Sequence, residues 1–263
     1  MIFHSSQYLP HPLLQHHVRH YLHYTFTKTV QQPFLPVGRQ TLAFSLGKAF
    51  RMINKAEKPQ WSPRIAVIGQ ITHLRYSFFE AGSEYLLIKL MPCAFHDLFG
   101  YPMHELADEG IDFCEIAGAP ARELTDKLSL ASGIQEAITL IEDFLMQRLS
   151  HSRHQVMATQ RIAMYLQEKK GDIRMDVLAR EMNCTPKSLE RHFLEMVGVM
   201  PKLYARMLRM HHVCKLAQRQ PDIRVQEIIY TCGYYDYAHF RRELMELTGM
   251  PPRALRQYLP QPV

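Results

Sequence analysis

Two arginines, Arg191 and Arg242, stand 51 residues apart in the C-terminal part of the 263-residue chain. Each falls on the polar side of an amphipathic helical pattern, opposite Leu189 and Phe193 in the first case and opposite Phe240 in the second. An exposed helical arginine can donate two hydrogen bonds to O6 and N7 of guanine, or bind a phosphate. Either residue alone is more simply a solvated arginine, but their repetition in register favours contact with DNA.

The register comes from an internal repeat, in which Arg, Gly and Pro recur at an offset of 51 residues. Each copy predicts a short helix, a tight turn and a second helix, which together form a helix-turn-helix, a motif whose second helix enters the major groove. Thr185 and Asp236 align and are expected as N-caps of the two second helices. The predicted segments are a helix over Met175–Met182, a turn at Asn183-Cys184 and a helix to Val197, then a helix over Val225–Thr231, a turn at Cys232–Tyr235 and a helix to Thr248.

A long helix is predicted between the two copies. Pro201 suits a first helical position, and no Gly or Pro interrupts the apolar stripe from Lys202 to Arg219. At 1.5 Å per residue this helix is roughly 27 Å long. It could hold two recognition helices about one turn of DNA, ~34 Å, apart.

Composition and charge agree with a two-domain chain. The sequence is 47% hydrophobic and 21% charged, with a formal net charge of +6. Residues 1–154 carry 14 basic and 14 acidic side chains, whereas residues 155–263 carry 17 and 11, so the whole excess lies in the second part. A basic domain joined to a neutral one indicates a polyanionic partner for the basic domain. Five cysteines without a Cys-x-x-Cys pair predict neither disulfides nor a zinc site, and no membrane-spanning helix or secretory signal is predicted.

The first part predicts a β-rich domain, either a small barrel or a sandwich. The expected strands are Thr41–Leu46, Ile65–Gln70, Arg75–Ala81 and Glu84–Met91, the last two forming a hairpin around Gly82-Ser83. Helices are expected at Cys93–Phe99, ended by Gly100, and at Ile134–Leu149, with irregular chain after the first of them to Pro120. The apolar stripe of Ile134–Leu149 packs either on the barrel, which we prefer, or on a second copy of the chain. Ser150–His154 is the expected linker.

Residues 1–32 contain six histidines, and His16 and His20 would share one face of a helix. The stretch has no acidic residue, so we predict an amphipathic segment rather than a metal site. The residues expected to point inward are Leu13, Leu14, Val18, Tyr21 and Leu22. Whether the histidines bind a metal is left open.

Five aromatic residues of the first domain either line a pocket in the barrel mouth or form its core, and we expect core. They are Phe44, Trp61, Tyr76, Phe78 and Tyr85. No His-x-His motif followed by Glu is present, and His73, His96 and His104 are expected as surface or hydrogen-bonded core histidines. We therefore expect no catalytic residue, no metal and no cofactor.

Residues 173–257 resemble the C-terminal DNA-binding domain of the AraC/XylS family of bacterial transcription regulators. The resemblance is carried by VLAREM at 177–182, TPKSLERHF at 185–193, GVMPKLY at 198–204 and GYYDYAHFRRELMELTGMPP at 233–252. More weakly, residues 10–24, 35–47 and 68–70 resemble the N-terminal domain of one branch of the family, which senses a small molecule or mediates dimerisation. The implied fold is α+β, with a β-rich domain over 1–154 and an all-α domain of two helix-turn-helix units over 155–263.

The resemblance also implies which residues contact bases. In the first unit these are Lys187, Glu190 and Arg191, and in the second they are Tyr237, Ala238, Arg241 and Arg242. Tyr234 and Leu244 stand where the family usually has Phe, and Met245 stands where a basic residue is usual. The last change removes a phosphate contact.

The expected function is sequence-specific regulation of transcription in the bacterial cytoplasm, in association with the nucleoid. The expected partners are double-stranded promoter DNA, RNA polymerase, a small-molecule effector and a second copy of the chain, with no membrane. One alternative is an enzyme or metal-binding barrel with an appended DNA-anchoring domain. Another is a DNA-binding protein whose first domain only dimerises. The sequence predicts neither the operator nor the sign of regulation.

Overall fold

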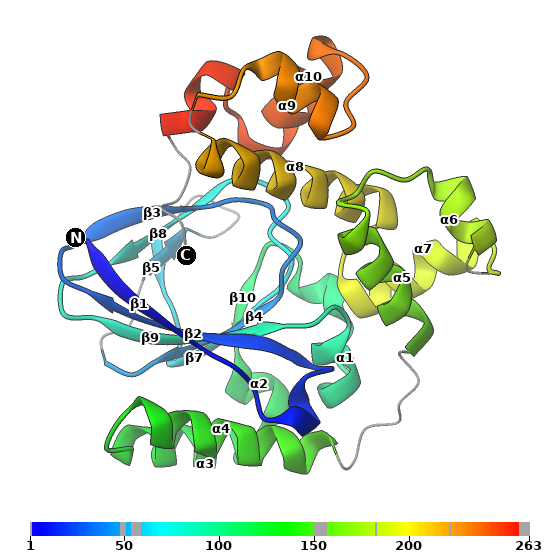
Figure 1. Ribbon diagram of the computed structural model, residues 1–263. Helices are drawn as coiled ribbons and strands as arrows, with labels where there is room; N and C mark the ends of the chain where they lie inside the picture. Colours follow the sequence, from blue (N-terminus) through cyan, green and yellow to red (C-terminus); the bar gives the residue numbers. More distant parts are fainter. Residues whose placement is uncertain are drawn as a thin grey trace.

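The computed structural model describes residues 2–47, 51–53, 59–149, 157–181, 183–220 and 222–257, apart from the side chains of 51–53, 59–61, 157 and 255–257. It has an N-terminal domain of antiparallel sheets and a helical C-terminal domain, as the sequence predicts (Figure 1). The expected linker Ser150–His154 lies outside the described residues. No helix in the described ranges is long and apolar enough to cross a membrane.

Two antiparallel sheets form the N-terminal domain. Among the described residues, the larger sheet has the strand order β1-β2-β9-β4-β7-β10 and the smaller has the order β3-β8-β5-β6. The larger sheet comprises β1 (Phe3–Tyr8), β2 (Val18–Phe26), β9 (Glu84–Leu90), β4 (Thr41–Ser45), β7 (Ile65–Ile68) and β10 (Gly110–Asp112). The smaller comprises β3 (Val30–Phe34), β8 (Arg75–Phe79), β5 (Arg51–Ile53) and β6 (Pro59–Trp61).

The predicted hairpin of residues 75–91 is wrong, although its strands and its turn exist. The backbone N–H of Ser83 donates to Glu80 O, so the chain does turn there. However, β8 pairs with β3 and β5, whereas β9 pairs with β2 and β4. The turn passes the chain between the two sheets, because Phe26 at the end of β2 is hydrogen-bonded to Ser83 and Gly82.

The N-terminal histidine-rich stretch is not an amphipathic helix. It consists of β1, a single 3-10 turn (η1, Pro12–Leu14) and the nine-residue strand β2. His16 and His20 therefore do not share a helical face, and Leu13 is exposed rather than inward-facing. The other four residues expected inside, Leu14, Val18, Tyr21 and Leu22, are buried. The long-range pairing of β2 with both β1 and β9 determines this structure, and short-range spacing does not reveal it.

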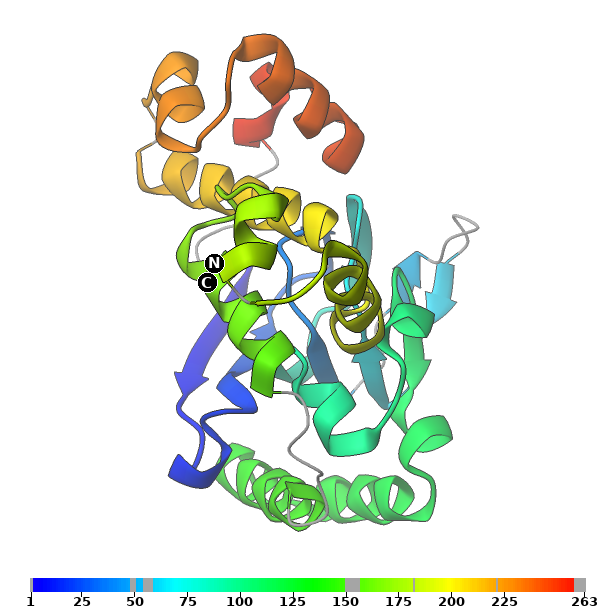
Figure 2. The same ribbon diagram turned by 90° about the vertical axis from the view of Figure 1, so that its right-hand side faces the viewer.

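Helices cover one side of the sheet domain. They are α1 (Ala94–Phe99), α2 (Phe113–Ala117), α3 (Ala119–Leu130) and α4 (Ile134–Leu149), with a 3-10 turn η2 (Met103–Leu106). The α4 prediction is confirmed, and its stripe packs into the core of its own domain, where Ile138, Ile141 and Leu145 are buried. The expectation of irregular chain up to Pro120 is wrong for η2, β10 and α2. Both α3 and α4 lie on the far side of the domain from α8 (Figure 2).

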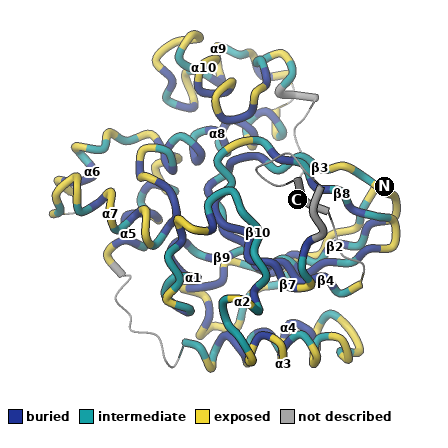
Figure 3. Tube along the Cα trace, turned by 180° about the vertical axis from the view of Figure 1, so that it is seen from behind, coloured by how far each residue is buried: buried dark blue, intermediate teal, exposed yellow. Residues whose placement is uncertain are grey.

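The C-terminal domain is helical throughout its described part. Its helices are α5 (Met157–Glu168), α6 (Met175–Glu181), α7 (Pro186–Val197), α8 (Pro201–Arg219), α9 (Val225–Thr231), α10 (Tyr237–Thr248) and the 3-10 helix η3 (Pro252–Gln257). Two helix-turn-helix units, α6–α7 and α9–α10, are joined by α8. Leu189 and Phe193 of the first unit, and their equivalents Phe240 and Leu244 in the second, are all buried in one continuous apolar core. In Figure 3, exposed residues are seen along α6, α7, α9 and α10.

The two domains contact each other closely. The Gln40 side-chain amide donates to the carbonyl of Val197, the last residue of α7, at 3.0 Å. The backbone N–H of Leu74 donates to the carbonyl of Leu247, in the last turn of α10, at 2.9 Å. Both recognition helices are thus hydrogen-bonded to the sheet domain at their C-terminal ends.

Candidate DNA-binding surface and ligand pocket

The first candidate recognition helix is α7. The Thr185 hydroxyl accepts a hydrogen bond from Ser188 N at 3.2 Å, which satisfies an N–H group that the helix itself leaves unbonded. Leu189 and Phe193 turn inward, so Lys187, Glu190 and Arg191 lie on the opposite, exposed side.

The second candidate recognition helix is α10. Asp236 caps it by accepting from His239 N at 2.7 Å. Phe240, Leu244 and Leu247 are buried, and the outward face carries the four side chains expected to contact bases, Tyr237, Ala238, Arg241 and Arg242, all exposed. Within the described ranges, neither Arg241 nor Arg242 takes part in a salt bridge, and the same holds for Lys187 and Arg191. These four cations are therefore available to an anionic partner.

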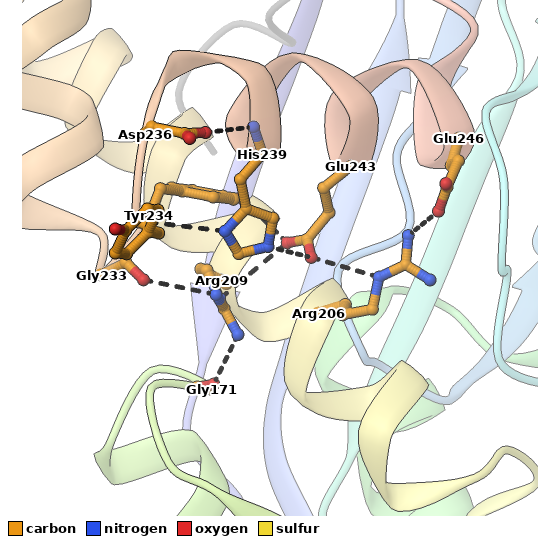
Figure 4. A network of polar contacts seen from close by, with 10 residues as sticks. Gly171, Arg206, Arg209, Gly233, Tyr234, Asp236, His239, Glu243 and Glu246 are labelled. Atoms are coloured by element: carbon orange, nitrogen blue, oxygen red, sulfur yellow. Dashed lines mark hydrogen bonds and ion pairs between the residues drawn. The ribbon is translucent and has the colours of Figure 1, made fainter.

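A polar network holds α10 against α8 (Figure 4). Its centre is Glu243, whose side chain is 5% exposed. One carboxylate oxygen accepts from the Tyr234 hydroxyl at 3.0 Å, and the other accepts from Arg206 Nε at 3.2 Å. Arg206 also donates to Glu246. Arg209 Nε lies farther away, 3.9 Å from the Glu243 oxygen that accepts from Tyr234.

Arg209 connects the two units. Its guanidinium donates to the carbonyl of Gly171, ahead of α6, and to the carbonyl of Gly233, in the turn of the second unit. It also lies over the ring of Tyr234, 5.2 Å from the centroid. One α8 side chain therefore links the turn of the second unit to the loop that precedes the first unit.

Sequence analysis missed this network. Glu243 corresponds in the repeat to His192, which is partly exposed, so the repeat did not point to it. A helical wheel does contain the signal, because Glu243 falls on the same side of α10 as Phe240 and Leu247. An acidic residue on an apolar face requires a buried cationic partner.

A cavity of about 410 Å³ lies between the sheet domain and α8. Strands β2, β3, β4, β8 and β9 supply most of its wall, and α8 supplies His211, Cys214, Lys215 and Gln218. Of the five aromatics discussed above, Tyr76 and Tyr85 line the cavity, Phe44 belongs to the core, and Phe78 is not part of the lining. The Trp61 side chain lies outside the described residues.

The polar lining of the cavity is mostly basic. Burial and the nearby Arg39 lower the pKa of Lys89 to about 7. Burial, followed by the charges of Arg39 and Lys89, lowers the pKa of His20 to about 4. His211 is affected in the same way, with a pKa lowered to about 3 by burial and then by Arg39. Its Nε2 lies 3.3 Å from Arg39 Nη2.

Within the described residues, no group of three or more His, Cys, Asp or Glu side chains could hold a metal ion. His17 contacts Asp97 at 2.7 Å and His23 contacts Glu84 at 2.6 Å, which are simple pairs. His96 bonds to the carbonyl of Tyr101.

The fold and these surfaces define a two-domain protein in which a sheet domain with a ligand-sized cavity supports a double helix-turn-helix domain. Residues 178–258 match a family described as a helix-turn-helix domain, and residues 6–112 match a domain of unknown function, DUF6597. The first match confirms the helix-turn-helix domain predicted from the internal repeat, and it lies in the part of the chain that resembles the AraC/XylS family.

Two named proteins are similar to this chain. The HTH-type transcriptional regulator GbdR of Pseudomonas aeruginosa is 33% identical over 93 residues, which are 35% of this chain. The chain spans about a quarter of the length of that relative. The structure of ToxT from Vibrio cholerae has a TM-score of 0.50 at 12% identity and covers 98% of both chains. ToxT bound to (E)-4-(8-methylnaphthalen-1-yl)but-3-enoic acid gives the same TM-score and identity, with 99% of this chain and 100% of that chain covered. ToxT therefore shares the two-domain fold.

Proposed function

We propose that this chain is a transcription regulator of the AraC type, which binds promoter DNA through α7 and α10 and responds to a small molecule in the cavity beside α8. One observation carries the DNA-binding part. Two helices at equivalent positions of a repeat each expose an arginine, Arg191 and Arg242, without an acidic partner among the described residues. The helix-turn-helix domain shared with GbdR supports the same function.

The proposal assigns base contacts to the seven exposed residues already named on α7 and α10. Lysine and arginine contacts to phosphate supply most of the affinity and make it depend on salt. Arg191 and Arg242 supply discrimination, worth about 1–3 kcal/mol for each bidentate contact with guanine. Glu190 accepts from a cytosine amino group or repels phosphate.

Selection of bound sites from random DNA tests the proposal. Arg191→Ala and Arg242→Ala should each relax the sequence preference at a few base pairs, and the two affected positions should lie about one helical turn apart. Arg180→Ala is the matched control, since Arg180 is exposed on α6 outside the recognition helices. It should leave the selected sequence unchanged. The assignment fails if both recognition-helix variants select the same sequence as the unchanged protein.

The small-molecule part rests on the cavity, whose volume lies in the range of ligand sites. ToxT, which shares the fold, has been seen with a small organic molecule bound, and this supports a ligand here. We place the division between the domains at residues 154/155 and the site of action in the cytoplasm, where its DNA target lies. RNA polymerase and a second copy of the chain complete the proposed partners. Sedimentation of the chain with and without operator DNA measures its oligomeric state, and so tests whether it pairs with a second copy.

We propose no catalytic activity. The proposed regulator needs none, and burial raises the pKa of Cys214, the thiol in the cavity lining, to about 12, which keeps it protonated and unreactive. Metal analysis of the purified protein tests the alternative of a metal-binding barrel, because a stoichiometric metal would support it.

A further inference from the structure

The cavity wall is ordered along the strands, with polar groups at one end and aromatic groups at the other. Alternate residues of β2 face the cavity, and in chain order they are His20, Leu22, Tyr24 and Phe26. The neighbouring β9 contributes Lys89, Leu87 and Tyr85 in the matching order, because it runs antiparallel. His20 pairs with Lys89, and Tyr24 pairs with Tyr85. At about 3.3 Å per residue, the two pairs are roughly 13 Å apart.

The third strand continues this gradient. Thr41 on β4 pairs with Lys89 and receives a hydrogen bond from its ammonium at 3.2 Å. Ala43 comes next on the cavity side and leaves space. At the far end, Phe26 stacks on Phe79 with ring centroids 4.3 Å apart. The cavity therefore has a basic end and an aromatic end.

The basic end has cations from both domains. Arg39 and Lys89 come from the sheet domain and Lys215 comes from α8. His20 and His211, whose pKa values are lowered to about 4 and about 3, are neutral near pH 7. Arg39 and Lys89 repel each other, and both charges lower the pKa of His20. Arg39 also lies beside His211.

No carboxylate balances these charges. The cavity lining includes no acidic residue, and within the described chain Arg39, Lys89 and Lys215 form no salt bridge. Arg75 differs, because Asp108 lies 4.0 Å from its Nε. Arg39 and Lys89 are partly buried and Lys215 is exposed, and like charges held near one another repel unless an anion joins them. An anion in the cavity would therefore be attracted by all three cations.

We propose that the cavity binds an amphipathic carboxylate, a molecule with one anionic group and an apolar body roughly 10–13 Å long. The carboxylate lies between Arg39 and Lys89 on the sheet domain and Lys215 on α8. The apolar body extends along β2 and β9 to Phe26 and Phe79. This inference rests on the proposed function, because it names the class of effector for the same site.

The position of the charge explains how such a ligand would act on DNA binding. Charge-assisted hydrogen bonds from two domains to one carboxylate favour the arrangement in which the domains are docked. The same helix, α8, joins the two helix-turn-helix units, and its Arg209 bonds to the loop before the first unit and to the turn of the second. An occupied cavity therefore fixes α8 against the sheet domain, and with it the positions of α7 and α10.

Calorimetric titration of the full chain with matched probes tests the inference. Decanoate supplies a flexible body and 4-phenylbutanoate an aromatic one, and the corresponding primary alcohols are the neutral controls. Both molecules present the same carboxylate to the basic end. The one that binds more tightly therefore shows whether the cavity prefers a flexible or an aromatic apolar body. We expect the better carboxylate to bind at least about tenfold more tightly than its alcohol, as one charge-assisted hydrogen bond would give.

Variants locate the charge. Lys89→Met and Lys215→Met should each weaken carboxylate binding about tenfold and leave alcohol binding unchanged. Lys202→Met is the matched control, since Lys202 is exposed on α8 away from the cavity. Lys89→Met removes a charge that burial and Arg39 disfavour, so we expect the variant to fold. Circular dichroism checks this. Equal binding of acid and alcohol overturns the inference, as does an unchanged affinity in both cavity variants or no binding of either acid at 1 mM.

Operator binding by the same preparations separates this inference from the proposed function. Carboxylate should change the affinity of the unchanged protein for selected DNA, and Lys215→Met should abolish that effect. If neither acid binds but the chain still selects a DNA sequence, the effector class is wrong and the proposed function stands. If an acid binds but no sequence is selected, the proposed function fails and the carboxylate site stands.

Discussion

Glu243→Gln isolates the contribution of the network behind α10. The substitution keeps the shape of the side chain and removes the charge that faces Arg206 and Arg209. Glu243 is 5% exposed, and its arginine partners are 25% and 14% exposed. Removing one member of a buried ion pair costs about 3–5 kcal/mol. In Glu243→Gln, Arg206 keeps its contact with Glu246, and a quarter of the Arg206 side chain is exposed to water. We therefore expect the substitution to destabilise α10 by about 2–3 kcal/mol.

Hydrogen exchange of the α10 amides measures this loss locally, without assuming that both domains unfold together. At 1.4 kcal/mol per factor of ten, exchange should be roughly 30- to 100-fold faster in Glu243→Gln. The control is Glu246→Gln, which also removes a partner of Arg206 from the same helix. Its side chain is 53% exposed, so the expected cost is below about 1 kcal/mol.

The same pair of variants tests whether the network sets the distance between the two recognition helices. Operators whose half-sites are shifted by one or two base pairs should be discriminated by the unchanged protein and by Glu246→Gln. Glu243→Gln should discriminate them less. The reasoning is refuted if both variants exchange their α10 amides at the same rate, or if Glu243→Gln retains the full preference for one spacing.

Three further results are expected. Asp236→Ala should cost about 0.5–2 kcal/mol through loss of the α10 cap, with Asp236→Ser close to the unchanged protein in thermal denaturation; equal losses would contradict the cap. Gly171→Ala should lower the free energy of unfolding by about 3 kcal/mol, because the new Cβ would lie 1.9 Å from the carbonyl oxygen of Ala205. In Gly249→Ala the new Cβ meets nothing within 4 Å, so only the positive φ should matter, at a cost of about 1–2 kcal/mol. A melting temperature lowered equally by both substitutions would refute this. Carboxylate affinity should change little between about pH 5.5 and pH 6.5, where the ligand is ionised and Lys89 is mostly protonated. At higher pH it should fall by up to about tenfold per unit, because Lys89, with a pKa of about 7 in the empty cavity, must then take up a proton. Titration calorimetry at several pH values would detect a flat profile, which contradicts the contact.

The helical elements could be predicted well because their signals are local. The stripe of α4, the proline at the start of α8 and the capping residues Thr185 and Asp236 all lie within the segment that they define. Strand pairing was less predictable because it is decided at a distance. The strands around Gly82 are adjacent in sequence and yet belong to different sheets.

The ligand pocket was hidden from sequence analysis for the same reason. His20, Thr41 and Lys89 become neighbours only through the register of three strands, and Lys215 joins them only when α8 docks on the sheet domain. The histidines of β2 drew attention to metal binding, although the informative residue was a lysine 69 positions further along the chain. Its burial could not be deduced from its charge.

The attachment of both recognition helices by their C-terminal ends has an evolutionary consequence. Val197 and Leu247, which bond to the sheet domain, lie about one and a half turns beyond the arginines of α7 and α10. Substitutions in the first turns of these helices leave both attachments untouched. A duplicated gene could therefore acquire a new operator while keeping its old signal, or acquire a new signal while keeping its operator. Diversification of paralogues along either route would need few compensating changes.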